Sequence, residues 1–199
     1  MGSVIKSIVE LDHTLFFFLN GAHCNFLDPV MKFFSNIYVW IPLYLLIAGC
    51  LFLVFPWKKA LLALLGILLT FLITDQLSSS LIKESIQRLR PSHIPGWEGT
   101  FRLLEGEGGL YSFVSSHAAN VFGLACLSSL LYRKRWFTVS IYTWATLVSY
   151  SRIYVGKHFP LDVLCGALLG MLAGWFVFWL YNLVLHKIER HAVHRRSHN

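Results

Sequence analysis

The chain has 199 residues, of which 56% are hydrophobic, 16% aromatic and only 14% charged. This composition excludes an ordinary soluble domain and favours a membrane protein. The 17 Lys and Arg residues outnumber the 10 Asp and Glu residues, which gives a formal net charge of +7. On so apolar a chain we ascribe this excess to membrane topology, and we expect no nucleic-acid partner.

The first predicted element is an amphipathic helix over residues 4–19, where apolar side chains recur at helical spacing with polar ones between them. Asn20-Gly21 ends the pattern. The run is too short and too charged to cross a bilayer. We therefore expect this helix to lie in the membrane interface.

The next helix is expected to begin at Asp28-Pro29, an N-cap residue followed by proline at the first helical position. It runs to Phe55, where Pro56 ends it, and its apolar section is long enough to span a bilayer. Pro42 lies inside this helix and is placed to kink it.

We expect an all-α, polytopic membrane bundle with about five transmembrane helices, forming one domain over residues 1–199. The second span continues as a helix to Leu89, and Pro91 stops it. Residues 92–111 are rich in Gly and Pro and form an aqueous loop, and residues 186–199 form a basic, His-rich tail. The predicted spans are 37–55, 60–77, 118–132, 136–150 and 161–185.

The charge of the connecting segments predicts the orientation of the bundle. The turns at 58–59 and 133–135 hold five cations and no acid, whereas residues 83–111 balance four cations against four acids. The positive-inside rule makes these turns and the tail cytoplasmic. The long loop and residues 151–162 then share the opposite, outer face of the membrane.

A polar stretch over residues 151–162 separates the last two spans, and charges at the mouth of a span are costly unless they have a function. Pro160 suits the first turn of a helix, from which Asp162 can reach back to His158 and fix its tautomer. Arg152 offers a planar fork that suits phosphate. An oriented histidine beside such an arginine suggests phosphoryl transfer, and a purely structural polar cluster is an equal alternative for these residues alone.

Two further polar groups are expected on the same face. Lys83 and Arg90 are seven residues apart on the predicted helix, about 20° apart around its axis, so both point to one side. Interfacial snorkelling is the simpler explanation for this pair. Ser115-Ser116-His117 opens the third span, where a serine cap leaves N–H groups free at the positive end of the helix. Each group alone is more simply structural, but all of them converge on one aqueous edge.

The chain resembles the type-2 phosphatidic acid phosphatase family, the lipid phosphate phosphatases related to vanadium haloperoxidases. The family's signatures are K-x6-RP, PSGH and SR-x5-H-x3-D. The first and third match in full within the segments 83–91 and 151–162. Two such patterns in the right order are highly specific. The resemblance covers residues 60–185.

The second signature matches in part. It reads Val114-Ser115-Ser116-His117, so Val114 and Ser116 replace the family's Pro and Gly. Serine restricts the backbone more than glycine does, which affects the geometry of the phosphate-binding amides but leaves His117 in place.

The resemblance implies a role for each matching residue. His158 would be the nucleophile that forms a phosphohistidine, Asp162 would orient it, and His117 would protonate the leaving oxygen and then activate water. No metal and no cofactor is implied, because fixed cations stabilise the charge. The phosphate-binding residues would be Lys83, Arg90, Arg152, Ser115 and Ser116.

The location of the site suggests the substrate. A membrane lipid can keep its tail in the bilayer while its phosphate enters the cation cluster, so we expect a lipid phosphate or pyrophosphate, with undecaprenyl pyrophosphate or lipid A favoured. The compact size resembles that of bacterial members, which predicts the inner (cell) membrane, with the site facing the periplasm. The alternatives are a non-catalytic protein that binds lipid headgroups at a degenerate site, and a haloperoxidase-like enzyme that uses vanadate.

Overall fold

The computed structural model describes residues 2–197, and the side chains of residues 2–190. These residues are helical apart from loops and one isolated β-bridge. A π-helical segment, Gln76–Ile82, joins α4 to α5, and short 3-10 turns lie at Ile37–Trp40 and Pro91–His93. The α-helices are α1 (Gly2–Gly21), α2 (Leu27–Ser35), α3 (Ile41–Val54), α4 (Trp57–Asp75), α5 (Lys83–Ile86), α6 (Ser116–Tyr132), α7 (Arg135–Tyr154) and α8 (Pro160–Ser197).

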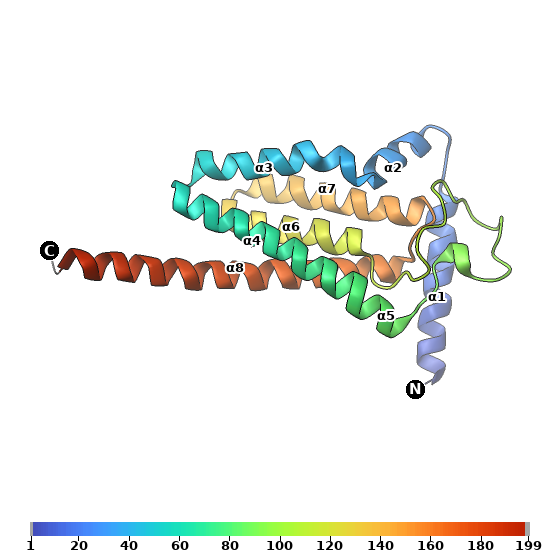
Figure 1. Cartoon of the computed structure of the whole chain (residues 1–199). Helices are drawn as coiled ribbons and strands as arrows, with labels where there is room; N and C mark the ends of the chain where they lie inside the picture. Colours follow the sequence, from blue (N-terminus) through green and yellow to red (C-terminus); the bar gives the residue numbers. More distant parts are fainter. Residues whose placement is uncertain (1, 198–199) are drawn as a thin grey trace.

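The long helices form a bundle. Figure 1 shows α3, α4, α6, α7 and α8 running side by side, while α1 crosses one end of the bundle. α6 lies in the middle, packed against α4, α7 and α8. The apolar core between these helices includes the almost completely buried Leu51, Leu124, Ala145 and Val177. Close van der Waals packing of such side chains holds the helices of a membrane bundle together.

Gly166 and Gly170 let α8 approach α6 closely. A Cβ on Gly170 would lie 2.1 Å from the carbonyl oxygen of Ala119, and one on Gly166 would lie 2.5 Å from that of Ser115. The two helix backbones are therefore in contact, as in the small-residue helix pairs of membrane proteins. This contact brings the first turns of α6 and α8 together, where the N–H of Ser115 donates to the carbonyl of Asp162 at 3.0 Å.

Length and composition support three of the five predicted spans. Within the part of the chain that the structure describes, the helical segments able to cross a membrane are Ile37–Val54, Trp57–Ile86 and Pro160–Arg190. α6 has only 17 residues, and the 20-residue α7 is more polar. Both nevertheless run beside the three apolar segments within the bundle (Figure 1).

The helix predicted over residues 28–55 is interrupted. α2 ends at Ser35, Asn36 is extended, and a 3-10 turn precedes α3. The side chain of Asn36 accepts from the N–H of Tyr38 at 3.0 Å, which caps this turn. Pro42 lies in the first turn of α3, so the predicted kink was wrong. Proline begins this helix, where its missing N–H costs nothing.

The prediction that Asp28 is an N-cap was also wrong. Phe26 occupies the cap position of α2, and Asp28 lies inside the first turn. Its carboxylate instead accepts from the hydroxyl of Tyr154 at 2.9 Å and pairs with the guanidinium of Arg102. The carboxylate thus contacts residues distant in the sequence and does not cap its own helix.

The helix that includes the second span ends earlier than the predicted Leu89. Gln87 takes a left-handed conformation with φ of 52°, which ends α5, and Leu89 belongs to the isolated β-bridge. Lys83 and Arg90 therefore do not share a helix face, as had been predicted. Lys83 is in the last helical turn, and Arg90 follows in an extended conformation.

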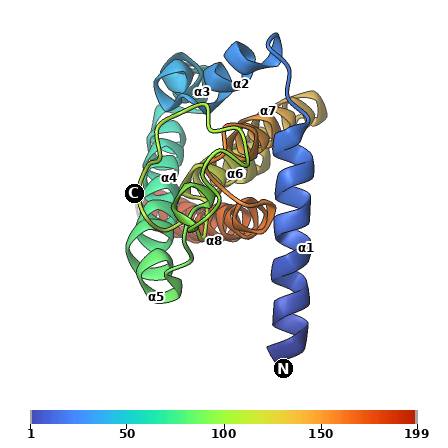
Figure 2. The same cartoon turned by 90° about the vertical axis from the view of Figure 1, so that its right-hand side faces the viewer.

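The ends of the bundle have the arrangement that the charge pattern predicted. The turns from α3 to α4 and from α6 to α7 lie at one end, together with the C-terminal part of α8 (Figure 1). The loop of residues 87–115 and the connection from α7 to α8 lie at the other end, beside α1 (Figure 2). α8 continues to Ser197, so most of the predicted tail is helical, and residues 198–199 lie outside the described part of the chain.

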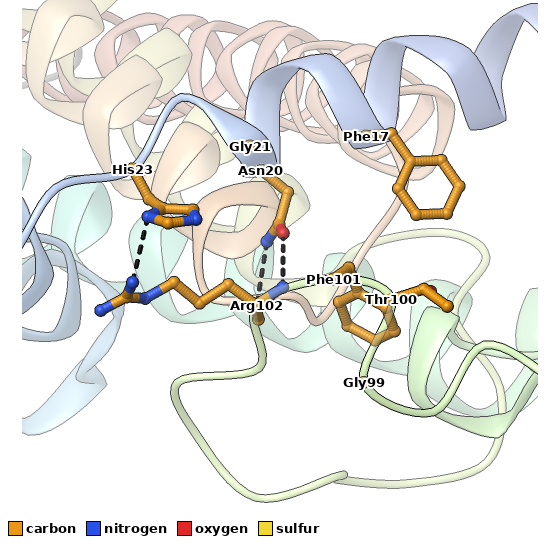
Figure 3. A pocket seen from close by; sticks show the side chains of 8 residues that line it. All are labelled: Phe17, Asn20, Gly21, His23, Gly99, Thr100, Phe101 and Arg102. Atoms are coloured by element: carbon orange, nitrogen blue, oxygen red, sulfur yellow. Dashed lines mark hydrogen bonds between the residues drawn. The ribbon is translucent and has the colours of Figure 1, made fainter.

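α1 is fastened to the end of the bundle by apolar and polar contacts. Phe16 is completely buried and packs against the rings of Phe101 and Phe159. Asn20 is also buried, and its amide group exchanges two hydrogen bonds with the backbone of Arg102 (Figure 3). α1 ends at Gly21, as predicted, and the loop is anchored to its last turn.

Candidate active site

His158 lies in the tight connection between α7 and α8. Gly156 makes this connection possible: its φ is +83°, and a Cβ there would lie 2.8 Å from the carbonyl oxygen of Arg102. The His158 residue is 1% exposed. Its Nδ1 is 3.6 Å from Oδ2 of Asp162, which is longer than a hydrogen bond, and it has no hydrogen-bond partner among the described residues.

Asp162 is positioned by a network that reaches into α1. Its Oδ2 accepts from the backbone N–H of Phe159 at 2.9 Å, and its Oδ1 accepts from Nη1 of Arg88 at 2.9 Å. Nη2 of Arg88 donates to Asp12 at 2.6 Å, and the other oxygen of Asp12 accepts from the N–H of Leu161 at 2.8 Å. Both ends of the Arg88 fork are therefore ion-paired, and the start of α8 is held from two sides.

Arg88 and Asp12 were not identified as site residues from the sequence. In the sequence, Arg88 is only one of the four cations of residues 83–111, and nothing distinguishes it from the others. Asp12 carries a signal, because the buried residues Asp12, Phe16 and Asn20 follow one another at four-residue spacing. A carboxylate in the buried stripe of an amphipathic helix requires a partner.

Two arginines line the site. Nη1 of Arg152 donates to the carbonyl of Ser35 at 3.2 Å, pairs with the hydroxyl of the same serine, and lies 3.5 Å from Glu105 Oε2. Nε of Arg90 donates to the carbonyl of Tyr111 at 3.2 Å. These neutral and weakly ionic partners leave guanidinium donors available for an anion, since each guanidinium carries five N–H groups.

Ser115 and Ser116 have different environments. Ser115 is fully buried and caps α6 by accepting from the N–H of Ala118 at 3.5 Å. Ser116, which stands where the family has glycine, accepts from Nζ of Lys83 at 2.9 Å, and its hydroxyl is 3.3 Å from that of Ser79. The serine in place of glycine thus supplies a partner for Lys83, and it tethers the last helical turn before the loop to the start of α6.

His117 connects two cavities. The larger has a volume of about 550 Å³, and Arg152 and Glu105 also line it. The smaller, of about 70 Å³, is mostly apolar and shares His117, Ser35 and Ile37 with the first. The polar cavity therefore opens onto a small apolar recess beside His117.

Burial and the neighbouring cations both lower the pKa of His158. Burial holds the pKa of His158 well below its ordinary value, and the charges of Arg90, Arg152 and Lys83 lower it further. Burial also lowers the pKa of Arg90. The imidazole is therefore neutral and its ring can act as a nucleophile, while the cations beside it favour an anionic ligand.

The residues of the three signatures come together at one end of the bundle. Lys83 contacts Ser116 at the start of α6, Ser115 contacts Asp162 at the start of α8, and Arg152 shares the large cavity with His117. A separate pocket of about 360 Å³ between α1 and the loop, shown in Figure 3, contains none of the predicted site residues.

The sequence matches proteins of known activity. A family model described as the PAP2 superfamily matches residues 38–185. The lipid A 4'-phosphatases of Bacteroides thetaiotaomicron and Porphyromonas gingivalis are each 37% identical to the chain, over 93% and 89% of it and over 81% and 75% of those relatives. An undecaprenyl-diphosphatase of Sulfolobus acidocaldarius is 33% identical over 82% of the chain and 74% of that relative.

Two solved structures have a similar fold. Aquifex aeolicus LpxE is 29% identical, with a TM-score of 0.63 over 84% of this chain and 94% of that one. A PAP2-type phosphatidylglycerolphosphate phosphatase from Bacillus subtilis is 26% identical, with a TM-score of 0.68 over 92% of this chain and 88% of that one. Together with the family match, which spans well over half of the chain, these similarities confirm the family that the signatures predicted: the chain belongs to the PAP2 superfamily and is a membrane lipid phosphate phosphatase.

Proposed function

We propose that this enzyme removes the 4'-phosphate of lipid A. The observation that carries this choice is the similarity to two lipid A 4'-phosphatases over most of both chains. The site supports it, because Arg152 and His117 line a cavity that adjoins a small, mostly apolar recess. A lipid phosphate could therefore place its headgroup among the cations while its acyl chains stay in the bilayer.

The mechanism that we propose uses the residues of the signatures. Nε2 of His158 attacks phosphorus, the bond from phosphorus to the lipid oxygen breaks, and His117 donates a proton to that oxygen. His117 then takes a proton from water, which attacks the phosphohistidine and releases phosphate. Throughout both steps Lys83, Arg90 and Arg152 stabilise the charge of the phosphoryl oxygens.

Asp162 has a positioning role in this proposal. It is held by Arg88 and by the N–H of Phe159, and its carboxylate lies 3.6 Å from Nδ1 of His158. A small shift of the imidazole on substrate binding would bring the pair into hydrogen-bond range. Such a bond would leave Nε2 unprotonated and would stabilise the positive charge that develops on the ring.

We also propose how the protein lies in the membrane. α3, α4, α6, α7 and α8 provide five spans of a single domain over residues 1–199, and α1 lies in the interface. The basic turns and the end of α8 then face the cytoplasm of a bacterial cell, and the site faces the periplasm. Cysteine accessibility at the exposed Lys134 and at the exposed Gly109, measured from outside the cell, tests this orientation.

The substrate is tested with purified protein in detergent micelles. Phosphate release and the mass of the lipid product are measured with lipid A as substrate, and His158→Ala is the control for contaminating phosphatases. We expect a product that has lost the 4'-phosphate and kept the 1-phosphate. Loss of the 1-phosphate alone, or no turnover by the wild-type protein, would contradict the assignment.

Undecaprenyl diphosphate is the second candidate, because the Sulfolobus acidocaldarius undecaprenyl-diphosphatase also aligns with most of the chain. It is assayed in parallel under the same conditions. A kcat/KM for undecaprenyl diphosphate at least tenfold above that for lipid A would favour this candidate.

A further inference from the structure

Lys157 is a buried cation outside the three signatures. It precedes His158, and it is 7% exposed. Its backbone N–H donates to the carbonyl of Arg152 at 3.0 Å, so its position is set by the same connection that places His158. Its ammonium group donates to the carbonyl of Gly106 and pairs with no carboxylate among the described residues.

The ammonium group of Lys157 adjoins the guanidinium of Arg90, one of the proposed phosphate-binding residues. The clearest evidence is at Gly108, where a Cβ would lie 3.2 Å from Nζ of Lys157 and 3.3 Å from Nη1 of Arg90. Both cations therefore border the same point of the loop. The two residues are also in direct contact, because Nη1 of Arg90 lies 3.5 Å from the carbonyl oxygen of Lys157.

Neighbouring buried cations repel each other unless an anion lies between them. Burial lowers the pKa of Lys157, and the charges of Arg152 and Arg90 contribute to this shift. The loop supplies oxygen atoms to the same cations: Glu105 lies against Arg152, and the carbonyl of Gly106 lies against Lys157. Two consecutive loop residues thus accept hydrogen bonds from these two neighbouring cations.

We propose that Lys157 is a fourth phosphate-binding cation, which exchanges the Gly106 carbonyl for a phosphate oxygen when substrate binds. Arg152 exchanges Glu105 for a second oxygen in the same movement of the loop. The inference rests on the proposed function only in requiring a phosphorylated substrate, whichever lipid carries the phosphate. It assigns to Lys157 a contact that adds to those of Lys83, Arg90 and Arg152.

The test measures phosphate binding separately from turnover. The Tm of the purified protein in detergent is followed as inorganic phosphate is added, because a ligand of the native state raises Tm according to its affinity. Lys157→Gln removes the charge and keeps a donor for Gly106, and Lys6→Gln is the matched control at an exposed position of α1. The Kd for phosphate and the KM and kcat for lipid substrate are compared.

We expect Lys157→Gln to weaken phosphate binding and to raise KM, each about tenfold, because one charge-assisted contact is lost. kcat should change less, and Lys6→Gln should match the wild type. Glu105→Gln should bind phosphate more tightly than the wild type, because the competing carboxylate charge is gone.

Unchanged phosphate affinity in Lys157→Gln, with only the ligand-free Tm reduced, would show that Lys157 is structural and would overturn the inference. If Lys157→Gln does not fold, Lys157→Met and Lys157→Arg are compared. Equal phosphate affinity of these two variants, with the Met variant folded, would also overturn the inference. Wild-type protein that binds phosphate but does not act on lipid A would contradict the proposed substrate and not this inference.

Discussion

Arg88 donates to Asp162 at 2.9 Å, and so it connects the carboxylate beside the candidate nucleophile to the first helix of the chain. The other half of its fork is paired with Asp12 at 2.6 Å. The cation also lies over the ring of Phe159, with 4.1 Å between the guanidinium carbon and the ring centroid. The first helix thereby takes part in the site, although no signature lies in it.

We predict that Arg88→Met destabilises the fold and reduces kcat. Removing one partner of a buried ion pair typically costs about 3–5 kcal/mol, because the other charges stay buried without compensation. Here Asp12 and Asp162 would both lose their cation. Thermal unfolding and steady-state kinetics measure the two effects, with Arg135→Met at the exposed start of α7 as the control. If Arg88→Met keeps the Tm and the kcat of the wild type, Arg88 does not position Asp162.

The two histidines should be separable by experiment. His158→Ala should abolish the phosphohistidine, whereas His117→Ala should lower kcat by about 10²- to 10⁴-fold through the loss of general acid catalysis. Acid-quenched protein labelled with ³²P-substrate reports the intermediate, and the phosphate-dependent Tm shift reports binding. Equal loss of phosphate binding in both variants would argue that His117 is structural.

The sequence predicted which segments meet at the candidate site better than it predicted their local geometry. Lys83, His117, Arg152 and His158 were predicted as site residues from the fixed spacings of the family signatures, and the structure brings their segments to one end of the bundle. The position of Arg90 was predicted wrongly, since a helical pattern does not reveal that the chain leaves the helix at Gln87.

The features that could not be predicted from the sequence depend on contacts between distant segments. Asp12 and Arg88 are 76 residues apart, and their pairing exists only because α1 crosses the end of the bundle. Likewise Asp28 suits a helix cap by local rules, yet it pairs with Arg102 and Tyr154. Local propensity cannot anticipate a partner that tertiary packing supplies.

The pH dependence should reflect the low pKa of His158. The pKa of His158 lies below the ordinary imidazole value of 6.5, so the ring is still neutral when the pH falls to 6.5. The plateau of kcat/KM should therefore extend below pH 6.5. Because the charge of Arg152 contributes to the shift, Arg152→Gln should raise this pKa and move the acid limb to higher pH. An acid limb of the wild-type profile above pH 6.5 would contradict the assignment of His158 as the neutral nucleophile.

The contact between α6 and α8 should be sensitive to one methyl group. Gly170→Ala would place a Cβ 2.1 Å from the carbonyl oxygen of Ala119, so the helices must separate. Overpacking of this kind costs about 1–3 kcal/mol or more, and we expect a lower Tm and reduced activity, since Ser115 and Asp162 would move apart. Gly49→Ala is the matched control, because no atom lies within 4 Å of its Cβ position. Equal Tm values for the two variants would contradict close contact of the helices.

Fixed cations should make turnover independent of divalent metal. Lys83, Arg90 and Arg152 already surround the phosphate position in our proposal, so activity should survive EDTA. Vanadate should inhibit, because it adopts the five-coordinate geometry of the transition state and the site is complementary to that geometry. Arg152→Lys keeps the charge but loses the planar fork, so it should weaken vanadate inhibition together with kcat/KM. The measurements are phosphate release with and without EDTA, and the vanadate Ki of both proteins. Activity lost in EDTA and restored by magnesium would mean that a metal, and not the arginine fork, stabilises the transition state.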